Sequence, residues 1–170
     1  MSHSGIREAT EQLSAAISAD PAKARAKAVP ATARLTEGLK CEVTGPQGQR
    51  LMTDMPPAMG GGASAPNPGW LMRGALASCT ATVIAMRAAK LGVALEALEV
   101  TVDTESDLRG ILGLDEAISA GHGPVRFMVK IRGNADPQTL REIVEWAEAH
   151  SPVGCTVRNR PACSLQIEVV

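Results

Sequence analysis

The sequence is poor in aromatic residues and carries almost no net charge. Phe, Trp and Tyr make up 2% of its 170 residues, and Tyr is absent. Because 45% of the residues are hydrophobic, the core has to be filled mainly by Ala, Leu, Val, Ile and Met. The formal net charge of −1 and the lack of a basic cluster argue against nucleic acid as a partner. Length and composition are typical of a globular domain with a sizeable core.

Membrane-spanning runs and export signals are also missing from the sequence. The most apolar stretch contains Arg73, Arg87 and Lys90, so it does not qualify as a membrane span. The first residues lack the cationic segment followed by an apolar segment that marks a secretory signal. We therefore expect a cytoplasmic protein without a membrane partner.

Cysteines are too few and too scattered for a disulfide scaffold or a zinc site. The four are Cys41, Cys79, Cys155 and Cys163, and no two of them form a CxxC pair. Small secreted domains held by disulfides carry a denser set, and structural zinc sites use closely spaced pairs. The sequence predicts free thiols, no metal and no cofactor.

One long central helix is the strongest local signal. Pro66 and Pro68 stand just before a run of good helix formers, and Gly92 stands just after it. Few charges interrupt this run, so most of its faces are expected to meet protein. Helical spacing places Cys79 on the same side as Leu76 and Val83, which predicts that the thiol points into apolar packing.

The remaining segments alternate between strand and helix patterns. Residues 1–30 predict a peripheral helix or a partly mobile arm, and residues 31–170 form the main domain. We expect a hairpin about 44–49, strands at 98–103, 125–132 and 163–170, a second helix beginning at Asp136 and a short turn capped by Ser151. Strands in runs separated by two helices favour an α+β fold with an antiparallel sheet. The loop 56–66 fits either a flexible connector or a backbone that approaches a substrate.

Cys79 has two interpretations from its residues alone. A single helical cysteine is either an inert small hydrophobe or a nucleophile that a nearby basic residue keeps as thiolate. Other polar residues predict structural roles: Asp54 caps a turn, and His150 ends a helix where positive charge suits the dipole. Cys163 is expected on the buried side of the last strand.

The stretch Asn67–Ala81 resembles the OsmC/Ohr family, in which an Asn-Pro turn opens a central helix that bears the reactive cysteine. Segments 53–57, 109–113 and 150–153 are similar to further landmarks of that family, and the resemblance covers residues 33–170. It implies an OsmC-like α+β fold, with an antiparallel sheet packed on the long central helix. It also implies an intertwined homodimer with two sites at the dimer interface.

The resemblance further implies a thiol peroxidase that reduces organic hydroperoxides or similar small apolar substrates. Cys79 would attack the distal oxygen and become a sulfenic acid, and a second cysteine would close a disulfide that a dithiol reductant opens. In the family an arginine stabilises the thiolate. Arg50 is the first candidate for this role here, and Arg34 is the second.

Two positions depart from the family pattern and leave alternatives open. Gly69 stands where the peroxidases usually have Glu, and Ser151 stands where their second cysteine precedes the Pro-Val pair. Cys155, one helical turn further on, replaces that cysteine if its segment is helical and turned inward. The alternatives are a dimeric binding module with little peroxidase turnover, and a one-cysteine enzyme resolved by an external thiol.

Overall fold

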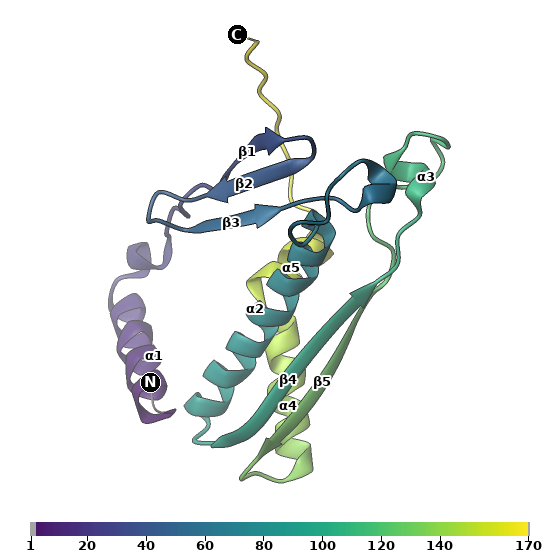
Figure 1. Ribbon diagram of the computed structural model, residues 1–170. Helices are drawn as coiled ribbons and strands as arrows, with labels where there is room; N and C mark the ends of the chain where they lie inside the picture. The colour runs from purple at the N-terminus through teal and green to yellow at the C-terminus, as the bar shows by residue number, and fades with distance from the viewer. Residues whose placement is uncertain (1–2, 170) are drawn as a thin grey trace. The chain divides into compact units, whose positions relative to one another are not determined.

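The computed structural model describes residues 3–169 and divides the chain into two compact units (Figure 1). The first unit comprises the chain up to Arg7 together with Leu76–Thr101 and Phe127–Val170, and the second comprises Glu8–Ala75 and Val102–Arg126. Helices α1 (His3–Ala19) and α2 (Pro68–Lys90) and strands β4 (Leu95–Thr104) and β5 (Val125–Gly133) each contribute residues to both units. The two units are described separately below.

The hydrophobic core lies in the first unit. Leu76, Thr80, Ile84 and Ala88 recur at four-residue steps along α2 and are fully buried. They belong to the same unit as the buried Ile143 and Ala147 of helix α4 (Pro137–His150), and the core cluster also takes in apolar residues of β4 and β5. Helix α2 ends as predicted, because Gly92 adopts a φ of 72° that favours glycine.

Strands β4 and β5 form a two-stranded sheet (Figure 1). Lys130 pairs with Glu99 and Arg132 pairs with Glu96, so residue numbers rise along β5 as they fall along β4. This order makes the pair antiparallel, as the sequence predicted. Inward and outward residues alternate along β5, so the face with Val129 and Ile131 packs on the core.

Two capping residues set the limits of the last helices. Asp136 accepts hydrogen bonds from the backbone N–H groups of Gln138 and Thr139, and Pro137 occupies the first position of α4. Ser151 ends α4 and caps α5 (Pro152–Asn159). The short turn predicted here is a helix of eight residues.

A stack of three side chains joins α2 to α4 in the first unit. The Arg87 guanidinium lies 4.6 Å from the centre of the Trp146 ring, and the His150 ring stacks on Trp146 at 3.9 Å. His150 Nδ1 also lies 2.7 Å from the Trp146 carbonyl oxygen. This position at the end of α4 agrees with the structural role predicted for His150.

The second unit contains a three-stranded antiparallel sheet of β1 (Thr32–Glu37), β2 (Lys40–Thr44) and β3 (Arg50–Thr53). Cys41 lies opposite Leu35 on β1 and Thr53 on β3, and it is half-buried. The predicted hairpin joins β2 to β3. Single helical turns η2 (Pro57–Met59) and α3 (Leu108–Ile111) interrupt the loops, while helix α1 (His3–Ala19) and turn η1 (Pro21–Ala24) occupy the predicted N-terminal arm.

The predicted strand at 163–170 is wrong for its described residues. Residues 160–169 have no regular secondary structure, and the alternating Leu165, Ile167 and Val169 are exposed by 85%, 75% and 91%. A strand needs a neighbour that completes its hydrogen bonds, and the described chain provides none for this segment. Cys163 is therefore exposed rather than part of the core. Val170 lies outside the described residues.

No helix among residues 3–169 combines the length and the apolar character needed to cross a bilayer.

Candidate functional site

The start of helix α2 forms as its sequence predicts. The Asn67 side-chain oxygen accepts a hydrogen bond of 2.9 Å from the Trp70 backbone N–H, and Pro68 is the first helical residue. This cap fixes the point from which the helix runs toward Cys79. Pro66 also holds the preceding loop, since its carbonyl accepts the Asp54 N–H.

Cys79 lies on α2 in the first unit and is half-buried. The deeply buried stripe of the helix is the one that contains Leu76 and Thr80, whereas Ser78 and Thr82 on either side of Cys79 are exposed. The expectation that the thiol points into the apolar packing is therefore wrong for the single chain. Within residues 3–169 the sulfur has no hydrogen-bond partner, so Cys79 is a free and partly accessible thiol.

Thr80 lines a cavity of about 370 Å³ in the same unit. Its side chain is 1% exposed, and its hydroxyl has no hydrogen-bond partner among the described residues. Phe127 and Val129 of β5 and Glu148 of α4 form other parts of the wall. An unpaired buried hydroxyl costs free energy, so this position is a local weakness of the core.

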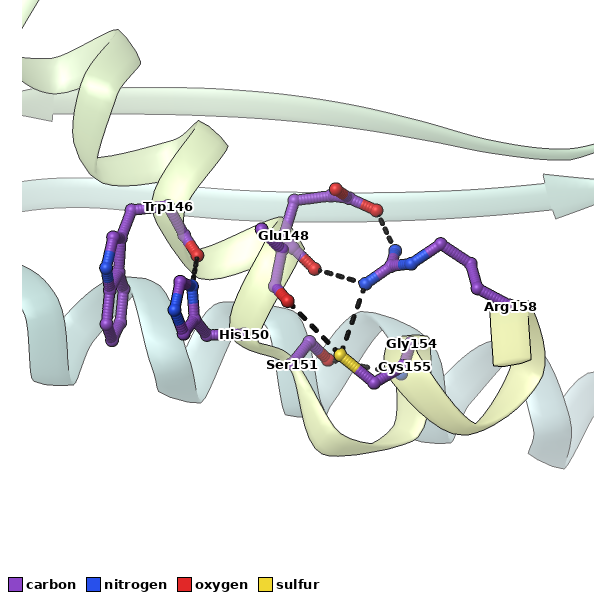
Figure 2. A network of polar contacts seen from close by, with 8 residues as sticks. Trp146, Glu148, His150, Ser151, Gly154, Cys155 and Arg158 are labelled. Carbon is purple, nitrogen blue, oxygen red and sulfur yellow. Dashed lines mark hydrogen bonds and ion pairs between the residues drawn. The ribbon is translucent and has the colours of Figure 1, made fainter. Parts of the chain in front are cut away.

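Cys155 lies on α5 within a network of polar contacts at the end of α4 (Figure 2). Its thiol donates to the Ala149 carbonyl oxygen at 3.2 Å, and Arg158 Nη2 lies 3.5 Å from the sulfur. Arg158 is itself held by the Glu148 carboxylate and by the Glu148 carbonyl oxygen. The guanidinium is therefore fixed as a hydrogen-bond donor beside the sulfur.

Ser151 has a structural role at the junction of α4 and α5. It is 1% exposed, and its hydroxyl accepts a hydrogen bond from the Gly154 N–H. The Cys155 N–H donates to the Ser151 carbonyl oxygen at 2.8 Å, which starts the turn that carries the thiol. The sequence therefore places a capping hydroxyl where the resemblance implies a second cysteine.

The arginines expected near Cys79 lie in the second unit. Arg50 forms an ion pair with Glu42 across β2 and β3, and its side chain is 72% exposed. Arg34 on β1 lies opposite Glu42 in the strand register. Arg109 pairs with Asp107, and that hydrogen bond lowers the pKa of the Asp107 carboxyl below its ordinary value of 3.8.

Asp54 closes the loop before α2, as its predicted capping role requires. The carboxylate is 4% exposed and accepts hydrogen bonds from the backbone N–H groups of Met55, Gly62 and Ser64 and from the Ser64 hydroxyl. Chiefly through the two Ser64 bonds, these contacts lower its pKa from 3.8 to about 2. The glycine-rich loop is therefore held in place around one carboxylate.

His122 is placed beside the start of α2 within the second unit. A Cβ atom at Gly69 would lie only 2.9 Å from His122 Nε2, so the imidazole occupies space that a side chain at 69 would need. His122 Nδ1 lies 3.2 Å from the Thr104 hydroxyl, which also accepts a hydrogen bond from Arg73. No local pattern predicts this arrangement, because His122 and Gly69 are far apart along the chain.

The predicted site residues belong to both units. Cys79 and Cys155 are free thiols of the first unit, and Arg50 belongs to the second. Sequence reasoning missed Arg158, although its helical spacing from Cys155 was a readable signal. Among residues 3–169, no group of His, Cys, Asp and Glu side chains could hold a metal ion.

Comparisons with a family model and with solved structures agree on the fold of this chain. A family model described as OsmC-like protein matches residues 60–166, a stretch that includes Cys79 and Cys155 but not Arg50. No curated protein matches the sequence. The crystal structure of an OsmC-like protein from Mycoplasma pneumoniae aligns with a TM-score of 0.67 and 16% identity, over 79% of this chain and 89% of that chain.

Two further solved structures carry names that refer to peroxides. An organic hydroperoxide resistance protein from Elizabethkingia anophelis has a TM-score of 0.61 and 18% identity, over 79% of this chain and 90% of its own. An organic hydroperoxide resistance protein from Legionella pneumophila has a TM-score of 0.56 and 20% identity, over 79% and 91%. At these identities the similarity shows a common α+β fold.

Proposed function

The chain belongs to the OsmC-like protein family, and from this premise we propose that it is a thiol-dependent peroxidase that reduces organic hydroperoxides. The observation that carries the proposal is the state of Cys79. This residue is a free, half-buried thiol on the helix opened by Asn67 and Pro68, inside the segment that matches the family. The hydroperoxide resistance proteins among the similar structures support the same class of substrate.

The proposed reaction begins at the Cys79 sulfur. The thiolate attacks the terminal oxygen of the hydroperoxide, the O–O bond breaks, and the alkoxide leaves as an alcohol after taking a proton. Cys79 becomes a sulfenic acid. A second thiol then attacks the Cys79 sulfur, water leaves, and a disulfide forms that an external dithiol reduces by exchange.

Cys155 is the proposed second thiol. Its position on α5 beside the Arg158 guanidinium supports this role, because the sulfur has a cationic neighbour within 3.5 Å. The hydrogen bond to the Ala149 carbonyl has to break before the sulfur can attack the sulfenic acid. The disulfide therefore requires α5 to release its thiol from the end of α4.

Arg50 is the proposed cation for Cys79. Its present partner is Glu42, and exposed ion pairs of this kind contribute little to stability, so the guanidinium can exchange partners. We expect Arg50→Ala to slow the oxidation of Cys79. Arg34→Ala is the matched comparison, because Arg34 faces the same Glu42 from the other neighbouring strand; slower oxidation of Cys79 in Arg34→Ala alone would assign the role to this second candidate.

We further propose that two copies of the chain form a homodimer. Apolar side chains of the β1–β3 sheet and the alternating Leu165, Ile167 and Val169 are exposed in the single chain. The exposed Met86 lies on the same side of α2 as Cys79. A second copy would cover these residues and bring its own charged groups toward the thiol. The cytoplasmic location remains a prediction from the sequence.

The test counts thiols after reaction with cumene hydroperoxide. All proteins carry Cys163→Ser, because the exposed Cys163 would otherwise form disulfides between molecules. We expect one equivalent of peroxide to consume two thiols, Cys79→Ser to consume none, and Cys155→Ser to stop at a sulfenic acid that dimedone traps. Cys41→Ser, which removes another half-buried thiol, should behave as the parent.

Other results of the thiol count would favour the one-cysteine enzyme or the dimeric binding module. If only Cys79 is oxidised even when Cys155 is present, the protein is a one-cysteine enzyme that an external thiol resolves. If Cys79 reacts no faster than a small-molecule thiol, the peroxidase proposal fails. A dimeric binding module is then the better description, and the altered positions Gly69 and Ser151 fit that description.

A further inference from the structure

A second cavity lies wholly within the second unit, beside the start of α2. Its volume is about 370 Å³, and residues of the loop before α2, of the first helical turn and of α3 line it. Met55, Met59, Leu108 and Ile111 make most of the wall apolar. The polar groups that reach it come from few residues, among them His122 and Asp107. Small-molecule sites have this composition, and the volume is at their lower end.

Of the two ring nitrogens of His122, Nε2 is the one that faces position 69. Arg73 can only donate, so the Thr104 hydroxyl oxygen accepts from it at 3.3 Å. The same hydroxyl lies 3.2 Å from His122 Nδ1 and engages that ring nitrogen. Nε2 takes no part in this network, and a neutral ring whose Nδ1 accepts the Thr104 hydrogen carries its proton on Nε2.

Gly69 makes room for this donor. A Cβ atom there would meet Nε2 at 2.9 Å and Cε1 at 3.0 Å, so any larger residue displaces the imidazole. Both Gly69 and His122 line the cavity, and Nε2 is the atom of the ring nearest to position 69. The position of the His122 ring therefore depends on the absence of a side chain at residue 69.

The charges around the cavity favour an acceptor or an anion over a cation. The N-terminus of the long helix α2 carries partial positive charge, and Arg73 supports the Thr104 hydroxyl on the far side of the ring. The one carboxylate in the wall, Asp107, is already paired with Arg109. A ligand carboxylate therefore meets positive and neutral groups at the His122 end of an apolar cavity.

We propose that this cavity binds a small aliphatic carboxylate, with its apolar chain among Met55, Met59 and Leu108 and its head hydrogen-bonded to His122 Nε2. The site involves neither Cys79 nor Cys155, so it does not depend on peroxidase activity. In this proposal Gly69 is the residue that admits the histidine, and His122 selects the ligand by its oxygen-bearing head.

Isothermal titration calorimetry tests the proposal, with octanoate, 1-octanol and octylamine as probes that share one chain length. The full-length Cys79→Ser protein is used, so that thiol chemistry contributes no heat. We expect octanoate to bind most tightly, octanol more weakly and octylamine not measurably. Removing the donor with His122→Ala should weaken octanoate about 10- to 100-fold, the range for a hydrogen bond to a charged group.

Gly69→Ala provides the sharper variant, because it leaves His122 in the chain and only displaces its ring. Its loss of octanoate affinity should equal that of His122→Ala, and the double variant should lose no more than either single one. Gly74→Ala is the matched control: it adds the same methyl group to α2, and that Cβ would lie 3.8 Å from the Trp70 ring, an ordinary contact.

Three results would overturn the proposal. One is equal affinity for octylamine and octanoate, which would show that the cavity binds the apolar chain without recognising the head group. Another is unchanged octanoate affinity in Gly69→Ala, provided that circular dichroism shows both alanine variants folded. The third is no heat of binding for octanoate at millimolar concentration. A negative thiol-count experiment would leave this proposal intact, because the two sites use different residues.

Discussion

Replacing Thr80 by Val should stabilise the protein, although Thr80 is among the most deeply buried residues of α2. Its hydroxyl is enclosed by the core at 1% exposure and lacks a hydrogen-bond partner in the described chain. Valine has nearly the same shape and replaces the hydroxyl by a methyl group. Helix propensities of the two residues are similar, so the change acts almost entirely on the buried polar atom.

The magnitude follows from the cost of burying a hydroxyl without a partner. Mutational data place this cost at about 1–3 kcal/mol, and the unfolded chain regains a hydrated hydroxyl when Thr is present. The cavity beside Thr80 relaxes part of the penalty, so we expect Thr80→Val to raise the free energy of unfolding by about 1–2 kcal/mol. In a chain of this size that corresponds to a rise in Tm of about 2–8 °C.

Urea unfolding followed by circular dichroism measures the effect, at one fixed protein concentration because association would shift the midpoint. Thr82→Val is the matched control. Thr82 is exposed on the same helix and donates to the Ser78 carbonyl oxygen, so its replacement should change stability by about 0.5 kcal/mol or less. A loss of stability in Thr80→Val would refute the reasoning, since it would mean that the Thr80 hydroxyl forms a favourable bond.

Three further predictions concern the loop before α2 and the core. The folded-state pKa of Asp54 is lowered to about 2, so its carboxylate stabilises the fold fully above pH 3.8. This contribution disappears as the pH falls toward 2. Urea unfolding midpoints measured from pH 5 to 2.5 should therefore drop more steeply in the parent than in Asp54→Asn. Gly61→Ala places a Cβ 2.0 Å from the Met55 carbonyl oxygen and should cost about 1–3 kcal/mol. Gly123→Ala, whose Cβ would lie 3.5 Å from the Glu105 carbonyl oxygen, should cost little in the same urea assay. Ile143→Ala leaves a hole in the fully buried core and should lower the free energy of unfolding by about 2–5 kcal/mol, against about 0.5–1.5 kcal/mol for Ile143→Val; equal losses would show that the core collapses around the gap.

The helix limits could be predicted from the sequence because their signals are local. Pro68 and Gly92 bracket α2, Asp136 and Pro137 open α4, and Ser151 caps α5. Each of these residues acts on backbone groups within a few positions of itself. Helix ends can therefore be predicted from the residues immediately around them.

The exposed faces could not be predicted in the same way. Apolar residues surround most of α2, so its pattern does not say which stripe is covered, and the structure buries the one with Thr80. Alternation at 163–169 marks residues suited to a strand, but pairing needs a neighbour that the sequence pattern does not name. Both errors arise where burial depends on contacts between distant segments.

The polar site residues also differ in whether local signals or contacts between distant segments place them. Arg158 follows Cys155 at helical spacing, so the pair could be found once the segment was taken as a helix. Asp54 was correctly expected at a turn, although its bonds to Gly62 and Ser64 come from across the loop. His122 approaches Gly69 only through the fold of the second unit, and no local pattern indicates it.

The stack on Trp146 has a consequence for optical work. The chain has only two indole rings, and that of Trp146 contacts a guanidinium and an imidazole. The other, Trp70, is half open to solvent beside the first turn of α2. A Trp146→Phe variant would leave Trp70 as the single indole, so its fluorescence would report on events at that turn.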